Sequence, residues 1–206
     1  MKAVCVPTSH PIAPFGGVVG EMAVEAGTLA ESQASSLQEA GFVLVDVAPE
    51  NEPYLVYSDR TWFTPELLLR LKRAGPGRVK VSDEGWNAWT GPLQDLVSPG
   101  VYEVGIRSGG RPGFDDLEPV EIDLGLSNMM LDPLHSSMEH AVPQPVRVGP
   151  AMVHQIDHWS HIVRINQLSL ASRMEIARYD WEKAGPLGKL WRLLKILLKA
   201  RSVNGW

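Results

Sequence analysis

The chain has 206 residues, of which 44% are hydrophobic and 21% are charged. This composition is typical of a globular protein of one domain, or of one domain with an appendage, and it excludes a disordered polymer and a multi-span membrane protein. Residues 1–150 carry 10 Lys and Arg against 20 Asp and Glu, whereas residues 151–206 carry 9 against 4. Because an acidic first part would repel a phosphate backbone, we expect no nucleic-acid partner.

The start of the chain has only a short apolar run, which is too short for a signal peptide. The single cysteine, Cys5, cannot form an internal disulfide. Both features predict a cytoplasmic protein, which would lie at the inner face of the membrane if its C-terminal segment binds lipid.

The first elements follow the order strand, helix, strand. Residues 2–6, KAVCV, form a short apolar run that predicts a buried strand. A helix is predicted over about residues 29–40, where Leu, Gln and Ala recur at helical intervals, and Gly41 can end it. The continuous apolar run FVLVDV, residues 42–47, predicts a second buried strand. This order is the unit that builds parallel sheets.

A third strand is predicted at residues 54–57, and a helix follows it. Three signals start that helix at residue 65: Thr64 can cap it, Pro65 suits its first position, and Glu66 places a negative charge near its N-terminus. The sequence AGPG stops the helix, so we expect it to cover residues 65–74.

Residues 78–81, RVKV, predict an edge strand or a half-exposed strand, and residues 101–106 and 119–124 are further strand candidates. Residues 1–106 therefore predict an α/β fold, with a mainly parallel sheet and flanking helices. Residues 107–150 are rich in Pro, Gly and Ser, which predicts an irregular segment.

The remaining residues, 151–206, predict a helical extension. We expect one long helix over residues 151–183, a break at AGPLG, and a second helix over residues 187–201.

Asp59 follows the strand at residues 54–57, and ligands of open α/β sheets bind at the carboxyl ends of the strands. One carboxylate can hold Mg²⁺ while substrate phosphates and water fill the other positions. The alternative is a turn residue before Thr64, with its charge neutralised by Arg60.

Gly16, Gly17 and Gly20 lie in the stretch PFGGVVGEM. They could let the backbone approach a phosphate, which the N–H groups of a following helix would favour. The alternative is a simple turn.

Two other groups of side chains have two interpretations each. Trp86 and Trp89 could stack on a base or a sugar, or they could lie in the core. His154, His158 and His161 would share one stripe of a helix and could bind zinc, or they could pack at a domain border.

The segment 187–201 predicts a cationic amphipathic helix with Leu and Trp on one side and four cations on the other, namely Lys189, Arg192, Lys195 and Lys199. Such a helix can lie on anionic lipid. It can instead pack its apolar side on the domain or on a second subunit and let the cations meet the acidic first part. The sequence thus predicts a peripheral membrane or protein partner for this segment, and a homo-oligomer.

Three segments in this order, GEMAVEAGTLAESQASSL, YLVYSDRTWFTPELLLRL and HWSHIVRINQLSL, resemble a known family. It is the sugar-nucleotidyltransferase-like family whose members carry a C-terminal left-handed hexapeptide β-helix. A helix with Trp and Asn seven positions apart is part of the resemblance, and here these residues are Trp159 and Asn166. No Arg or Lys follows Gly20 before Arg60, Ser160 replaces an acidic residue of the family, and the hexapeptide repeats are absent. These departures indicate a degenerate form.

The resemblance implies transfer of a nucleotidyl group to a sugar 1-phosphate, with Mg²⁺ bridging the phosphates. A nucleotide and a sugar phosphate would then be the partners. The implied site has Asp59 as the catalytic and metal-binding residue, Gly16, Gly17 and Gly20 against the nucleotide phosphates, and Trp86 or Asn87 against the sugar or base.

The alternative function is a non-catalytic scaffold or assembly protein. It would keep the nucleotidyltransferase-like shape and use residues 187–201 to bind a membrane or a partner.

Overall fold

The computed structural model describes residues 1–8, 12, 16–25, 27–130, 145–185, 188, 190 and 191. The chain forms two compact units, Met1–Ser169 and Leu170–Trp206. The first unit contains the sheet, the charged cluster around Arg60, Asp59 and both cavities described below. It extends well past residue 106, where the sequence predicted the end of the α/β part.

The elements of the chain, in order, are β1 (Lys2–Val6), η1 (Val19–Glu21), β2 (Ala23–Val24), β3 (Gly27–Thr28), α1 (Leu29–Glu39), β4 (Val43–Leu44), β5 (Tyr54–Ser58), β6 (Thr61–Phe63), α2 (Pro65–Ala74), β7 (Gly77–Lys80), α3 (Glu84–Thr90), β8 (Val101–Arg107), β9 (Pro119–Glu121), β10 (Ser127–Met130), β11 (Pro145–Val148), β12 (Val153–Gln155) and α4 (Trp159–Lys183). Helix α4 begins in the first unit and continues into the second.

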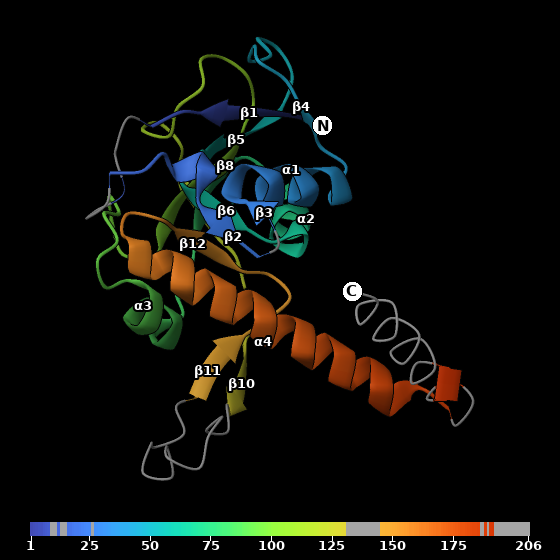
Figure 1. Ribbon diagram of the computed structural model, residues 1–206. Helices are drawn as coiled ribbons and strands as arrows, with labels where there is room; N and C mark the ends of the chain where they lie inside the picture. The colour runs from blue at the N-terminus through green and yellow to red at the C-terminus, as the bar shows by residue number, and fades with distance from the viewer. Residues whose placement is uncertain are drawn as a thin grey trace, which may run out of the picture. The chain divides into compact units, whose positions relative to one another are not determined.

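Six strands form the main sheet in the order β4-β1-β5-β8-β7-β9. Strand β8 is antiparallel to its neighbours β5 and β7, and the other pairs are parallel. Helices α1 and α2 pack against each other beside this sheet (Figure 1). The predicted α/β fold with a mostly parallel sheet is confirmed.

The core includes the strand β5 and the helix α2, both of which the sequence predicted. Every residue of β5 is buried. On α2, Leu67, Leu68 and Leu71 are fully buried, and each such leucine contributes about 1.5–3 kcal/mol to the free energy of unfolding. The first helix is fixed at its N-terminus by a capping box between Thr28 and Glu31.

Helix α2 has the predicted bounds, but its cap differs from the prediction. Thr64 occupies the N-cap position without making a side-chain cap. Its hydroxyl instead donates to the carbonyl of Pro150 at 2.9 Å and accepts from the N–H of Met152 at 2.9 Å. The threonine therefore joins α2 to the segment that precedes β12.

Three predicted elements were wrong. Residues 42–47 supply only the two-residue strand β4, whose Val43 and Leu44 are exposed because β4 is the edge of the sheet. Strand β7 lies between β8 and β9, so it is an interior strand and not an edge. The predicted helix over residues 151–183 begins only at Trp159, because β12 pairs with β6 first.

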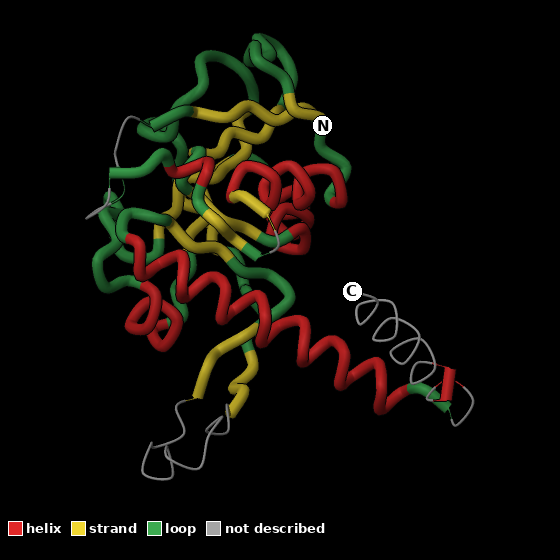
Figure 2. Tube along the Cα trace, viewed as in Figure 1, coloured by secondary structure: helices red, strands yellow, loops and turns green. Residues whose placement is uncertain are grey.

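The segment 107–150 is less irregular than predicted. It contributes β9 to the main sheet and the antiparallel pair β10–β11, whose strands are drawn in yellow in Figure 2. Most of the predicted helix at residues 187–201 lies outside the described residues. None of the helices among the described residues has an apolar stretch of the length that a membrane span requires.

Asn166 of α4 holds the short hairpin β2–β3 in the first unit. Its side-chain oxygen accepts from the N–H of Glu25 at 2.6 Å, and its amide nitrogen donates to the carbonyl of Ala23 at 3.3 Å. Glu25 has a φ of 59°, and its carboxylate accepts from the hydroxyl of Ser169 at 2.6 Å. Asn166 thus has a structural contact that the sequence resemblance did not predict.

Candidate functional site

The strand order reverses between β1 and β5. From β1 the chain passes through α1 to β4 at one edge, and from β5 it passes through α2 to β7 on the other side. Ligands of open α/β sheets bind at such a point, outside the carboxyl ends of the two strands. These ends are Val6 and Ser58, which are paired in the sheet.

Asp59 lies directly at this point. Its carboxylate accepts from the N–H of Thr8 at 3.0 and 3.1 Å and from the hydroxyl of Thr8 at 2.6 Å. Its own N–H donates to the carbonyl of Val6 at 3.3 Å. Asp59 therefore joins the loop after β5 to the loop after β1, and it caps no helix.

No ion pair of the described residues includes Asp59. A carboxylate with two oxygens can accept about four hydrogen bonds, and the contacts with Thr8 leave part of this capacity open. Asp59 can thus bind an added cation without first breaking a salt bridge.

Asp59 lies in the turn between β5 and β6, as the alternative predicted, but Arg60 does not neutralise its charge. Its Nε and Nη2 donate to the two carboxylate oxygens of Glu103 at 2.9 and 2.8 Å, and its Nη1 donates to Asp157 at 2.6 Å. The Arg60 side chain is only 9% exposed. This charged cluster of Arg60, Glu103 and Asp157 is structural, since its cation has no free direction toward a ligand.

The two carboxylates of the charged cluster respond differently to burial. Burial disfavours the charged form of Glu103, but the hydrogen bonds and charge of Arg60 outweigh it and hold the pKa of Glu103 below its usual value. Burial dominates at Asp157 and raises its pKa, although the N–H of Asp95 and the charge of Arg60 oppose the change.

The three candidate glycines form no phosphate loop at a helix N-terminus within the described residues. Gly16 has a φ of 65° and donates to the carbonyl of Ile12 at 2.8 Å, and Gly17 is bridged to the same residue. Gly20 lies in η1, a three-residue 3₁₀ helix. The α-helix that was expected to supply N–H groups begins later, at Leu29.

Trp86 is fully buried, and its Nε1 donates to the hydroxyl of Tyr102 at 3.2 Å. The predicted contact of Trp86 with a sugar or base was therefore wrong, because its ring belongs to the core. Trp89 is half-buried, with the guanidinium of Arg164 5.2 Å from its ring centre. Asn87 donates from its amide to the carbonyl of Val81 at 2.8 Å and lines a cavity.

The predicted histidine stripe does not exist. His154 lies on β12, whereas His161 lies on α4. His161 is fully used, because its Nδ1 accepts from the N–H groups of Asp157 and His158 and its Nε2 contacts the carbonyl of Pro92 at 3.0 Å. Within the described residues, no group of three His, Cys, Asp or Glu side chains could hold a metal ion.

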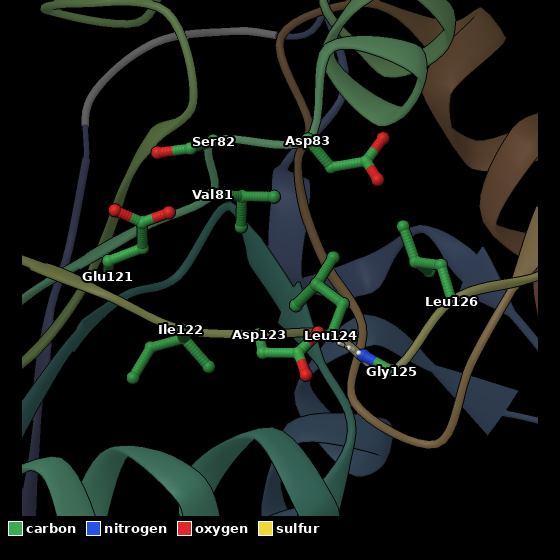
Figure 3. A pocket seen from close by; sticks show the side chains of 9 residues that line it. All are labelled: Val81, Ser82, Asp83, Glu121, Ile122, Asp123, Leu124, Gly125 and Leu126. Atoms are coloured by element: carbon green, nitrogen blue, oxygen red, sulfur yellow. Dashed lines mark hydrogen bonds between the residues drawn. The ribbon is translucent and has the colours of Figure 1, made fainter.

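An acidic pocket of about 640 Å³ opens beyond the ends of the parallel strands β7 and β9. Figure 3 shows Asp83, Glu121 and Asp123 among the side chains that line it. Asp83 is paired with Arg147 and caps α3, and Asp123 accepts from the N–H of Gly125 at 2.8 Å. Two of the three acids therefore already have structural contacts.

The sequence analysis missed Thr8, Glu103 and Asp157. Thr8 had a usable signal, because it follows β1 as Asp59 follows β5. Glu103 and Asp157 had none, since they are 43 and 97 positions from Arg60 in the chain.

Comparisons with known proteins add no family to this description. No family model matches the chain, and no curated protein matches it either.

Proposed function

We propose that the chain is a sugar-phosphate nucleotidyltransferase-like domain that binds a nucleotide with Mg²⁺ at the carboxyl ends of β1 and β5. The observation that carries this proposal is the carboxylate of Asp59, which lies at the reversal of strand order and has no cationic partner among the described residues. Mg²⁺ is commonly held by one or two carboxylates together with substrate phosphates and water.

Asp59 would hold the metal ion, and Thr8 would orient the carboxylate. Mg²⁺ when bound would neutralise the charge of the phosphates. In this proposal the sugar 1-phosphate accepts the nucleotidyl group. Its sugar would contact Asn87. The loop that contains Gly16, Gly17 and Gly20 has no Arg or Lys to contact the phosphates. This lack favours a degenerate site with weak or no transfer activity.

Thermal unfolding with a panel of nucleoside triphosphates and nucleotide sugars, each with Mg²⁺, tests the proposal. A ligand that binds only the native state raises the melting temperature by mass action. We expect a rise for at least one nucleotide, its loss in Asp59→Asn, and its retention in Asp46→Asn, which changes an exposed aspartate in the same way. The absence of any rise in the wild type would reject the proposal.

A second candidate function is binding of a membrane or protein partner through residues 187–201. It is supported by the exposure of Leu190 and Trp191, 63% and 58%, on the side of the segment that the sequence predicts to be apolar. Co-sedimentation with vesicles of anionic lipid, with and without residues 187–206, tests it. Vesicle binding that needs these residues and falls at high salt would support this function, and equal binding by both forms would reject it.

A further inference from the structure

A cavity of about 290 Å³ lies between the end of α3 and the start of β8. It is separate from the acidic pocket and shares no residue with it. Its lining carries no charged side chain and consists of Asn87, Gly91, Gln94, Leu96, Pro99 and Gly100. We call it the Asn87–Gln94 cavity.

The two amide side chains of this cavity have buried oxygens without a partner. Neither Asn87 Oδ1 nor Gln94 Oε1 has a hydrogen-bond partner in the described part of the chain. An unpaired buried acceptor costs about 1–3 kcal/mol, so two of them in one cavity wall need an explanation.

The contacts of the amide nitrogens define the orientation of both side chains. Asn87 Nδ2 donates to the carbonyl of Val81 at 2.8 Å, and a flipped amide there would place two oxygens against each other. Gln94 Nε2 donates to the carbonyl of Gln155 at 3.1 Å and lies 2.8 Å from Nδ1 of His154, so its orientation goes with a His154 tautomer whose Nδ1 accepts. Both oxygens are buried within residues of the cavity wall, so a ligand that reaches them must donate hydrogen bonds.

The loop that carries most of the lining has one strained residue beside the cavity. Leu93 precedes Gln94 without lining the cavity itself, has a φ of 70°, which a side chain of this type rarely adopts, and is 64% exposed. Gly100 has a φ of 74°, and an added Cβ there would lie 2.2 Å from the carbonyl oxygen of Val81. Because the two oxygens are shielded when the cavity is empty, a ligand must displace this wall slightly to reach them.

We propose that the Asn87–Gln94 cavity binds a small neutral ligand rich in hydroxyl groups, such as a monosaccharide ring. Hydroxyl groups would donate to Asn87 Oδ1 and Gln94 Oε1, while Leu96 and Pro99 would contact the C–H face of the ring. The lining has no cation for an anionic ligand and no carboxylate for an ammonium ion. The inference stands on the cavity alone, and under the proposed function the ligand would be the sugar of the sugar phosphate.

Titration of the ¹⁵N-labelled full chain with single sugars, observed by NMR, tests this inference. The probes are glucose, galactose, mannose and N-acetylglucosamine, without phosphate or nucleotide, and ammonium chloride serves as the cation probe. We expect a saturable shift of the side-chain amide signals of Asn87 and Gln94 with at least one sugar, and none with ammonium.

Gln94→Met removes one acceptor at nearly constant volume, and Gln38→Met makes the same change at an exposed position of α1. The sugar affinity, measured from the shift of the Asn87 signal, should be at least fivefold weaker in Gln94→Met. It should be unchanged in Gln38→Met. The inference is overturned if no sugar shifts either signal in the wild type, if ammonium gives the same shift, or if Gln94→Met binds as the wild type does. Since the sugars carry no phosphate, failure here leaves nucleotide binding at Asp59 to its own test.

Discussion

Asp59 and Arg60 are neighbours in the chain, yet they belong to two different kinds of charged site. Arg60 is buried and bonded on both sides by Glu103 and Asp157, whereas the Asp59 carboxylate accepts hydrogen bonds from Thr8 and has no ion pair among the described residues. A buried charge must be paired because its loss of hydration is costly, and a paired charge has little left for a ligand. A partly buried carboxylate at a strand end can still accept contacts from a ligand. In this account Arg60 therefore contributes to stability, and Asp59 contributes to binding.

The largest expected effect is the loss of stability when the buried Arg60 is replaced. Arg60→Met would leave two buried carboxylates without their cation, and we expect a loss of about 3–5 kcal/mol in the free energy of unfolding. Urea denaturation measures it. Arg73→Met is the matched control, because the Arg73 side chain is 70% exposed and its ion pair should contribute less than about 1 kcal/mol. Equal losses in the two variants would contradict a structural role of the charged cluster.

His154 of β12 is fully buried, and we expect its ionisation to make the free energy of unfolding depend on pH. Burial, and then the charge of His161, lower the pKa of His154 to about 3 from an ordinary value of 6.5. Between these two values the unfolded chain takes up a proton that the folded chain rejects. The free energy of unfolding should therefore fall by up to about 1.4 kcal/mol per pH unit as the pH drops below 6.5.

Urea denaturation from pH 7 to pH 4 measures this dependence. His154→Gln removes the titrating ring and should flatten the slope, although His161, with a pKa that burial also lowers, keeps part of it. Identical slopes for the wild type and the variant would show that His154 is not the responsible group.

A smaller loss of stability is expected when the hydrogen bond between Thr8 and Asp59 is removed. Thr8→Val removes the hydroxyl that donates to the carboxylate at 2.6 Å, and hydrogen bonds to charged groups contribute about 1.5–3 kcal/mol. Thr8→Ser keeps the hydroxyl and should retain most of the stability. Thermal and urea unfolding of both variants compare them, and a serine variant as unstable as the valine variant would mean that the hydroxyl contributes little.

Much of the fold follows from local signals in the sequence. The strand at Tyr54–Ser58 and the helix α2 are readable because a continuous apolar run marks the first, and Pro65 and Gly75 mark the ends of the second. Strand β4 was overestimated, because an edge strand with exposed Val43 has the same apolar sequence as a buried one.

The candidate site was only partly predictable. Asp59 could be proposed from its place after a strand, whereas the partners of Arg60 could not, because they come from β8 and from the turn before α4. The histidine spacing was misread because β12 and α4 divide a segment that has one continuous helical pattern. Pairings between distant segments decide such cases, and they leave no local pattern.

The most direct test of the central claim is isothermal titration of Mg²⁺ with each nucleoside triphosphate into the wild type, Asp59→Asn and Asp46→Asn. The account predicts saturable binding of at least one nucleotide, one per chain, in the wild type and in Asp46→Asn. In Asp59→Asn the affinity should be at least about tenfold weaker, a loss typical of changes at a metal site. Equal affinity in all three proteins would contradict the claim that the Asp59 carboxylate at the ends of β1 and β5 is the binding group.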